Sequence, residues 1–143
     1  MIDDYKFDAV RQAVKPLSIL LDASTPRLGD VTICEVPTAA SHVRRLGYDH
    51  AKLLAKTLAW RRHLRYRPLL KRTGQQTQHF SGRQARLAQA AKLFTARQSI
   101  SGPVLLIDDI VTTGASLQAA TKVLYGAGAS EVYSSVLVRQ PLD

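Results

Sequence analysis

The sequence predicts one α/β domain with a mainly parallel, twisted β-sheet flanked by helices. Segments with strand-like and helix-like patterns alternate along the chain, which is typical of right-handed β-α-β units. The strand-like segment 104–107 is apolar at every position, as expected for a strand covered on both faces inside a parallel sheet. The length of 143 residues, 45% of them hydrophobic, suits a single domain with one core, spanning residues 1–143.

The first third of the chain is predicted to hold helical turns, a loop and a strand. Residues 5–7 are interpreted as extended and a helix is expected to begin at Asp8, with Pro16 opening a further helical turn. Residues 23–30 contain Pro and Gly and are expected to form a loop. The β-branched segment 31–36 predicts a strand.

The segment after that first strand is a candidate ligand-binding loop. It consists of Pro37, Thr38, Ala39 and Ala40, and Pro37 is expected to end the strand. A loop in this position lies at the carboxyl end of the sheet, where open α/β proteins bind ligands. An ordinary strand–helix connection is about equally consistent with the sequence.

Four further elements follow from the hydrophobic pattern. Residues 47–63 have helical spacing, with Asp49 suited to cap the helix and Trp60 interpreted as a packing or contact residue. Residues 67–72 predict a strand, followed by a polar loop over 73–78 that could act as a lid. A helix is expected after Ser81, with an apolar face that reaches Phe94. A helix over 116–126 and a last strand over 131–138 complete the domain.

The segment 104–116 carries the strongest functional signal. The apolar strand is followed by two adjacent carboxylates, Asp108 and Asp109, and then by Thr112, Thr113, Gly114, Ala115 and Ser116. Hydroxyls and backbone N–H groups around a glycine at a helix N-terminus are suited to bind phosphate. Capping of the helix alone would explain any single one of these residues. The complete ordered string favours binding, because adjacent acids after a buried strand add no stability.

This segment resembles the PRPP (5-phosphoribosyl-1-diphosphate) binding motif of the type I phosphoribosyltransferases. The resemblance implies that Asp108 and Asp109 contact the ribose hydroxyls and help to position Mg²⁺, and that residues 112–116 hold the 5-phosphate. It implies that the backbone of the Pro37 loop, with Lys71 and Arg72, neutralises the pyrophosphate. The implied reaction is transfer of the phosphoribosyl group with release of pyrophosphate, in which positioning and charge neutralisation replace a protein nucleophile.

Further residues narrow the resemblance to the ComF-like competence proteins. Residues 46–50, Leu-Gly-Tyr-Asp-His, and the following Ala/Leu helix are similar to that family, as is the spacing of Gln78, Arg86, Gln89 and Phe94. Leu46 and Gln89 depart from the usual Arg and Asn. The cysteine-rich zinc-binding module often seen at the N-terminus of the family is expected to be absent, since Cys34 is the one cysteine and suits a buried strand. The resemblance keeps a second function open: a non-enzymatic accessory factor in DNA uptake that retains the PRPP site.

Charge and hydropathy bear on partners and location. Residues 44–97 contain fourteen Lys or Arg residues and a single acid, Asp49, which indicates an anionic partner such as a phosphate-rich substrate or nucleic acid. Contacts with DNA-uptake or recombination proteins and a homodimer are further expectations. No apolar segment is long enough to insert in a membrane and the N-terminus is acidic, so a cytoplasmic location is expected.

Overall fold

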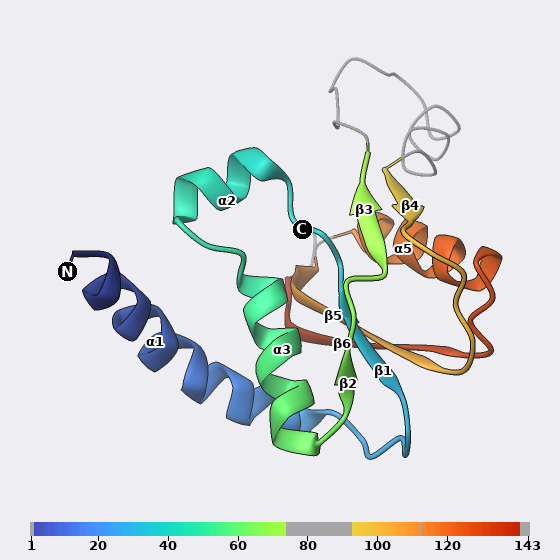
Figure 1. The fold of residues 1–143 in the computed structure, drawn as a ribbon, viewed down its shortest axis with the longest axis horizontal. Helices are drawn as coiled ribbons and strands as arrows, with labels where there is room; N and C mark the ends of the chain where they lie inside the picture. The colour runs from blue at the N-terminus through green and yellow to red at the C-terminus, as the bar shows by residue number, and fades with distance from the viewer. Residues whose placement is uncertain (1, 74–92, 112, 141–143) are drawn as a thin grey trace.

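The computed structural model describes residues 2–73, 93–111 and 113–140 and has the predicted α/β architecture (Figure 1). The elements, in chain order, are α1 (Ile2–Ser24), β1 (Thr32–Glu35), α2 (Ala40–Leu46), α3 (His50–Arg62), β2 (Arg65–Tyr66), β3 (Leu70–Arg72), β4 (Phe94–Ala96), β5 (Val104–Val111), α5 (Ala115–Gly126) and β6 (Val132–Arg139). The fold class predicted from the sequence is therefore confirmed.

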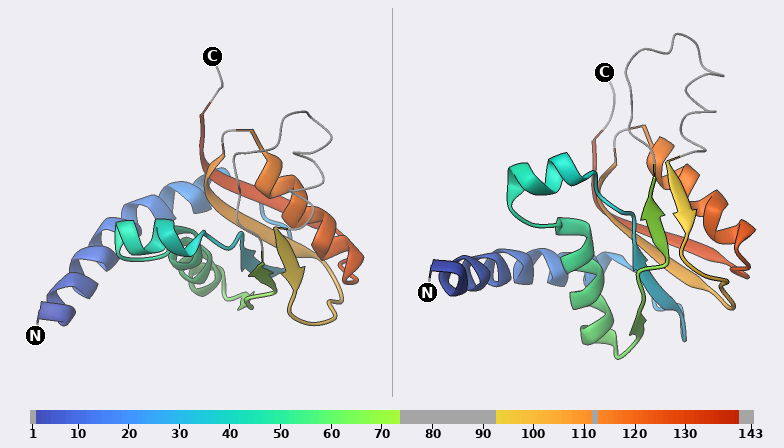
Figure 2. Two further views of the ribbon diagram at one scale, coloured as in Figure 1. Left: turned by 90° about the horizontal axis from the view of Figure 1, so that it is seen from above. Right: turned by 45° about the horizontal axis from the view of Figure 1, so that its top comes forward.

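The main sheet has four parallel strands in the order β2-β1-β5-β6. Helices α1 and α3 cover one face and α5 covers the other (Figure 2). Side chains of β5 alternate between these faces: Leu106 joins the core beneath α5, whereas Leu105 and Ile107 join the core beneath α1 and α3. This burial on both sides explains the uninterrupted apolar run at the start of β5.

The predicted strand over 67–72 is too long, because only its last three residues form a strand, β3, and a separate short strand, β2, ends just before it. Strand β2 pairs with β1 in the main sheet, whereas β3 pairs with β4 in a separate two-stranded antiparallel sheet. Pro68 lies between β2 and β3 and has no N–H group for a sheet hydrogen bond, which favours a break at this point.

The helix predicted to reach Phe94 is also corrected at its end. Phe94 begins β4 and pairs with Arg72 of β3, so it belongs to a strand. The polar loop over 74–78 and the helical start at Ser81 lie outside the described residues.

Helix α1 is longer and more continuous than the sequence predicted. It includes residues 5–7, interpreted above as extended, and it passes through Pro16 without ending. Val14 and Leu21, on either side of the proline, are both buried against the sheet and α3. This shared buried face explains why the helix continues despite the backbone hydrogen bond that a proline removes.

Arg62 at the end of α3 ties that helix to the end of α1. Its guanidinium donates to the Asp22 carboxylate at 2.6 Å and to the backbone carbonyls of Asp22, Thr25 and Pro26. The Asp22 carboxylate also accepts from Arg61 at 3.1 Å, and the hydrogen bond from Arg62 is the main cause that holds the pKa of Asp22 below its usual range. Arg61 and Arg62 therefore serve the α1–α3 joint rather than standing free for an anion.

Among the helices in the described ranges, none combines the length and the apolar character that crossing a bilayer requires.

Candidate functional site

Asp108 and Asp109 lie on β5, near the carboxyl end of the main sheet. The strand continues to Val111, so the two acids are strand residues rather than the first residues after it. Their side chains accept local backbone hydrogen bonds: Asp109 N–H donates to Asp108 Oδ1 at 2.9 Å, and Ile110 N–H to Asp109 Oδ1 at 2.8 Å. These local hydrogen bonds engage one oxygen of each carboxyl group.

Burial raises the pKa of Asp108 to about 7, and the neighbouring Asp109 carboxyl and the charge of Asp49 add to the effect. A partly desolvated carboxyl beside two other acids favours its protonated form. A cation or a set of hydroxyl donors at this position would restore the charged form. This electrostatic arrangement suits a site that binds a metal ion or a diol.

The turn that follows β5 brings a helix N-terminus to the same edge of the sheet. Gly114 is left-handed, with φ of 81°, and precedes α5 without a side-chain cap. The Thr113 hydroxyl accepts from the backbone N–H of Ala115 at 3.2 Å. The first turn of α5 can present backbone N–H groups to an anion. Ala115 and Ser116 belong to that turn, and Thr112 lies outside the described residues.

The Pro37 loop lies at the carboxyl end of β1, the strand that pairs directly with β5. The Thr38 hydroxyl donates to Asp49 Oδ1 at 3.0 Å, and the same oxygen accepts the Lys52 N–H at 3.1 Å. Asp49 thus caps α3, as predicted, and also fastens the loop to the start of that helix.

Arg72 reaches this loop from the opposite side. Its Nη1 donates to the Pro37 carbonyl at 3.1 Å, and its guanidinium lies 5.4 Å from the centre of the Phe94 ring. Partial burial lowers the pKa of Arg72, an effect that the negative charge of Asp108 opposes. The guanidinium is therefore near both the loop and the acidic pair.

The structure separates the two cations that the sequence placed together. Lys71 and Arg72 are consecutive residues of β3, so their side chains project from opposite faces of the two-stranded sheet. Lys71 is exposed, whereas Arg72 is half-buried against the Pro37 loop. In this conformation only Arg72 of this pair joins the candidate site.

Asp49 is a site residue that sequence reasoning treated only as a helix cap. Its charge acts on Asp108, and its side chain holds Thr38, so it connects the loop with the acidic pair. Its position contained a usable signal, because the helix predicted over 47–63 is the first one expected after the strand over 31–36, and such a helix starts at the carboxyl edge of the sheet. The hydrogen bond to Thr38 depends on the folded loop.

The Glu35–Tyr66 pair lies at the end of β1, just before the Pro37 loop. Glu35 is buried at the end of β1 and its carboxylate accepts a hydrogen bond from the Tyr66 hydroxyl at 2.6 Å, which joins β1 to β2. Burial raises the pKa of Tyr66, and the hydrogen bond to Glu35 adds to this. The neighbouring Cys34 is fully buried, as predicted, and burial raises the pKa of its thiol to about 12. Cys34 is thus a packing residue and not a nucleophile.

The donor set at β5 fits Mg²⁺. Carboxylate oxygens of Asp108 and Asp109 are hard ligands of the type that this ion prefers, and Mg²⁺ is commonly held by one or two carboxylates with substrate phosphates and water. Within the described ranges, no group of three or more His, Cys, Asp or Glu side chains could hold a metal.

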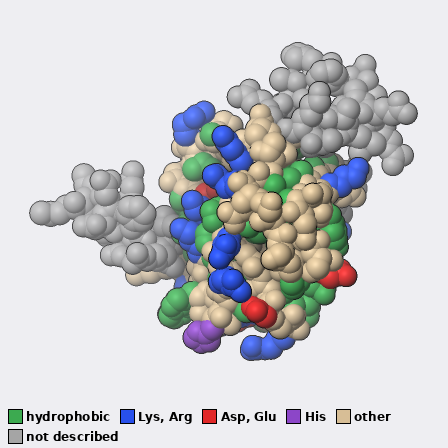
Figure 3. Space-filling model, turned by 45° about the vertical axis from the view of Figure 1, so that its right-hand side comes forward, with side chains coloured by type: hydrophobic (Ala, Val, Ile, Leu, Met, Phe, Trp, Pro, Cys, Tyr) green, Lys and Arg blue, Asp and Glu red, His purple; other side chains and the backbone are tan. Residues whose placement is uncertain are grey.

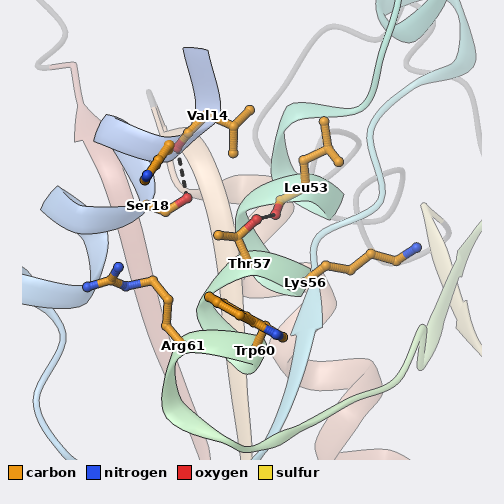
Figure 4. Close-up of a pocket in the computed structure, with 8 residues that line it drawn as sticks. Val14, Ser18, Leu53, Lys56, Thr57, Trp60 and Arg61 are labelled. Atoms are coloured by element: carbon orange, nitrogen blue, oxygen red, sulfur yellow. Dashed lines mark hydrogen bonds between the residues drawn. The ribbon is translucent and has the colours of Figure 1, made fainter. Parts of the chain in front are cut away.

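A separate pocket of about 680 Å³ lies between α1 and α3, away from the acidic pair (Figure 4). Two of its hydroxyls bond within their own helices: Ser18 to the Val14 carbonyl at 2.8 Å and Thr57 to the Leu53 carbonyl at 2.7 Å. Trp60 lines the pocket and is 78% exposed, so it is not a core residue. Its interpretation as a contact residue stays a prediction.

Basic side chains gather along one side of the face shown in Figure 3, with few acidic ones among them. The exposed cations of the described part of residues 44–97 lie on α2, α3, β2 and β3 and on the segments that follow the strands; they are Arg44, Lys52, Lys56, Arg61, Arg65, Arg67, Lys71 and Arg97. Four described members of the block donate side-chain hydrogen bonds within the protein: Arg61, Arg62, Arg72 and Arg97. The remaining charge is suited to a polyanion.

Comparisons with known proteins agree with this architecture. The chain is 26% identical over 136 residues to "Competence protein ComFC" of Streptococcus pneumoniae, covering 94% of this chain and 60% of the relative. The chain thus spans less than two thirds of that protein. No protein-family model matches.

Two solved structures share the fold over 87% of this chain. One is described as the allosteric regulatory enzyme of purine biosynthesis, with a TM-score of 0.61 and 21% identity, covering 25% of that chain. The other is glutamine phosphoribosylpyrophosphate (PRPP) amidotransferase from B. subtilis, with a TM-score of 0.60 and 22% identity, covering 26% of that chain. The chain is therefore similar in sequence to this ComFC protein and has the type I phosphoribosyltransferase fold that these two solved structures share.

Proposed function

We propose that the protein binds PRPP with Mg²⁺ at the carboxyl edge of β1 and β5 and transfers the phosphoribosyl group with release of pyrophosphate. The observation that carries this proposal is the position of Asp108 and Asp109 between two segments suited to anions. On one side lies the Gly114 turn at the N-terminus of α5, and on the other lies the Pro37 loop with Arg72.

Each part of PRPP has a matching group in this arrangement. The 5-phosphate would bind residues 112–116, a segment whose N–H groups and hydroxyls are suited to phosphate. The ribose hydroxyls would bind the two carboxylates of β5. The pyrophosphate would bind the backbone of Pro37, Thr38 and Ala39, with Arg72 providing positive charge. Lys71 would contribute only if β3 changed its conformation.

The proposed reaction exchanges one bond for another at the anomeric carbon. The acceptor's lone pair forms a bond to that carbon while the bond to the pyrophosphate oxygen breaks, and pyrophosphate leaves with the electron pair. Mg²⁺, when bound, would neutralise charge on the diphosphate. The protein's own residues position the sugar and stabilise the departing charge, which requires no covalent protein intermediate.

Titration calorimetry with Mg²⁺ and PRPP tests the binding step. The unmodified protein should bind, and the double variant Asp108→Asn/Asp109→Asn should lose at least about tenfold in affinity, since two charged contacts are removed. Asp30→Asn is the matched control, because this exposed acid lies before β1, at the opposite end of the strand. Absence of binding to the unmodified protein would remove the proposal.

Pyrophosphate release in the presence of a panel of nucleobases and amines tests the transfer step. An acceptor-dependent release that the double variant lacks would support transferase activity. The second candidate is an accessory role in DNA uptake that retains the PRPP site, supported by the name of the ComFC relative and by the exposed cations of α3 and β2. PRPP binding without release for any acceptor would favour this second function.

A further inference from the structure

The Pro37 loop is held by side chains from two elements that are far apart in the sequence. Arg72 of β3 donates from its Nη1 to the Pro37 carbonyl at 3.1 Å. The Thr38 hydroxyl donates to Oδ1 of Asp49, the residue that caps α3, at 3.0 Å. Consecutive residues of the loop are therefore attached to different parts of the fold.

The contact with Arg72 determines which way the peptide between Pro37 and Thr38 faces. The described residues contain no cis peptide bond, so the Pro37 carbonyl and the Thr38 N–H point in opposite directions. Because the carbonyl faces Arg72, the Thr38 N–H faces away from it. No described group accepts a hydrogen bond from this N–H, which makes it a backbone donor suited to an anion.

The contact with Asp49 restricts the backbone of Thr38. A β-branched side chain such as Thr is stiff about χ1, so a hydroxyl that is held also limits the movement of its own Cα. Asp49 is itself fixed, because its Oδ1 accepts the Lys52 N–H at 3.1 Å at the start of α3. Helix α3 is anchored in the core by Leu54 and Leu58. The core thus supports the loop through α3 and this carboxylate.

We propose that Asp49 is a positioning residue for the pyrophosphate: by accepting the Thr38 hydroxyl, it keeps the N–H groups of the Pro37 loop ordered for that anion. This role rests on the proposed function, because it concerns the same site. The Thr38 hydroxyl donates to Asp49 and so contributes order rather than a contact with the ligand. A loop that is ordered before binding lowers the entropic cost of binding.

The role requires an oxygen acceptor at position 49 and does not require a charge. The side-chain carbonyl of Asn can accept the same hydrogen bonds from Thr38 and Lys52, whereas Ala can accept neither. A negative charge beside an anion site disfavours binding of that anion. Asp49→Asn should therefore bind PRPP at least as tightly as the unmodified protein, and Asp49→Ala should bind it more weakly.

NMR relaxation of the backbone amides, measured without ligand, tests the effect on the loop. Thr38→Val keeps the shape of the side chain and the cap of α3 but removes the hydroxyl. It should lower the order parameters of residues 38 and 39 from the rigid value of about 0.85 to below about 0.6. Thr38→Ser should stay closer to the unmodified protein. Thr57→Val is the matched control, because its hydroxyl bonds the Leu53 carbonyl within α3 at 2.7 Å.

Titration calorimetry with Mg²⁺ tests the effect on binding through two ligands that differ in the pyrophosphate. Thr38→Val should bind PRPP about tenfold more weakly than the unmodified protein, because the ligand must then order the loop. Ribose 5-phosphate lacks the pyrophosphate and should bind both proteins equally. Thr38→Ser should restore part of the PRPP affinity, and Thr57→Val should change neither affinity. A general loss of stability would not separate the two ligands in this way.

The results distinguish this role from the proposed function. Absence of PRPP binding by the unmodified protein removes the proposed function, and this role with it. Unchanged PRPP affinity or unchanged order parameters in Thr38→Val remove the role alone. An equal loss of affinity for PRPP and ribose 5-phosphate also overturns it, as does a loss in Asp49→Asn as large as that in Asp49→Ala.

Discussion

Replacing Asp108 by Asn should stabilise the fold while it weakens PRPP binding. Asp108 is half-buried in a position where its charge is disfavoured by desolvation, by Asp109 and by Asp49. Asn has nearly the same shape and can still accept the Asp109 N–H hydrogen bond, yet it carries no charge. The substitution therefore isolates the electrostatic strain of the acidic pair.

The pKa of Asp108 sets the size and the pH range of this effect. Folding raises it from 3.8 to about 7, so the unfolded chain releases this proton at a lower pH than the folded protein. Stability must then fall as the pH rises from about 4 to about 7, and stay lowered above that range. At 1.36 kcal/mol per pKa unit, the charged Asp108 lowers the free energy of unfolding by at most about 4 kcal/mol. We therefore expect the free energy of unfolding of the Asn variant to be about 2–4 kcal/mol higher near about pH 8.

Urea unfolding followed by circular dichroism at several pH values measures this gain. The Asn variant should be more stable near about pH 8 and close to the unmodified protein near about pH 3.5, where the carboxyl is neutral in both states. Asp30→Asn should change stability little at either pH, because Asp30 is exposed. A loss of stability for Asp108→Asn at neutral pH, or a gain that does not depend on pH, would refute the electrostatic reasoning.

Three further outcomes follow from particular contacts. Arg62→Ala removes the donors to the Asp22 carboxylate and to three backbone carbonyls. It should lower the free energy of unfolding, measured in urea, by about 3 kcal/mol. Arg65→Ala, at an exposed position, is the control and should change this free energy by less than about 0.5 kcal/mol. Gly114→Ala places a side chain at a residue whose φ is 81°, which should lower the free energy of unfolding by about 1–2 kcal/mol. It should also weaken PRPP binding measured by calorimetry. Unchanged affinity would argue against this turn as the phosphate site. Single-stranded DNA should bind with an affinity that falls steeply as the salt concentration rises. Lys52→Glu/Lys56→Glu should reduce the slope of log affinity against log salt concentration, measured by fluorescence anisotropy. An affinity that does not depend on salt would exclude polyanion binding.

The sequence determined the elements whose signals lie within a few residues. The apolar run that enters β5, its two acids and the glycine turn before α5 are contiguous, so their order alone predicted a strand, a turn and a helix N-terminus. The cap at Asp49 is equally local, because a side chain there reaches the N–H three residues later. The length of β5 beyond the acids was not predictable, since it depends on pairing with β6.

Only the tertiary structure decided which distant residues meet. Phe94 has a helical pattern in sequence, yet pairing with β3 made it a strand residue. Arg72 rather than Lys71 faces the Pro37 loop because alternation along β3 is fixed by that same pairing. Pro16 predicted a new turn, but the buried face shared by Val14 and Leu21 keeps α1 continuous. Contacts of this kind join segments far apart in the chain, so their energies are set by packing that local patterns do not encode.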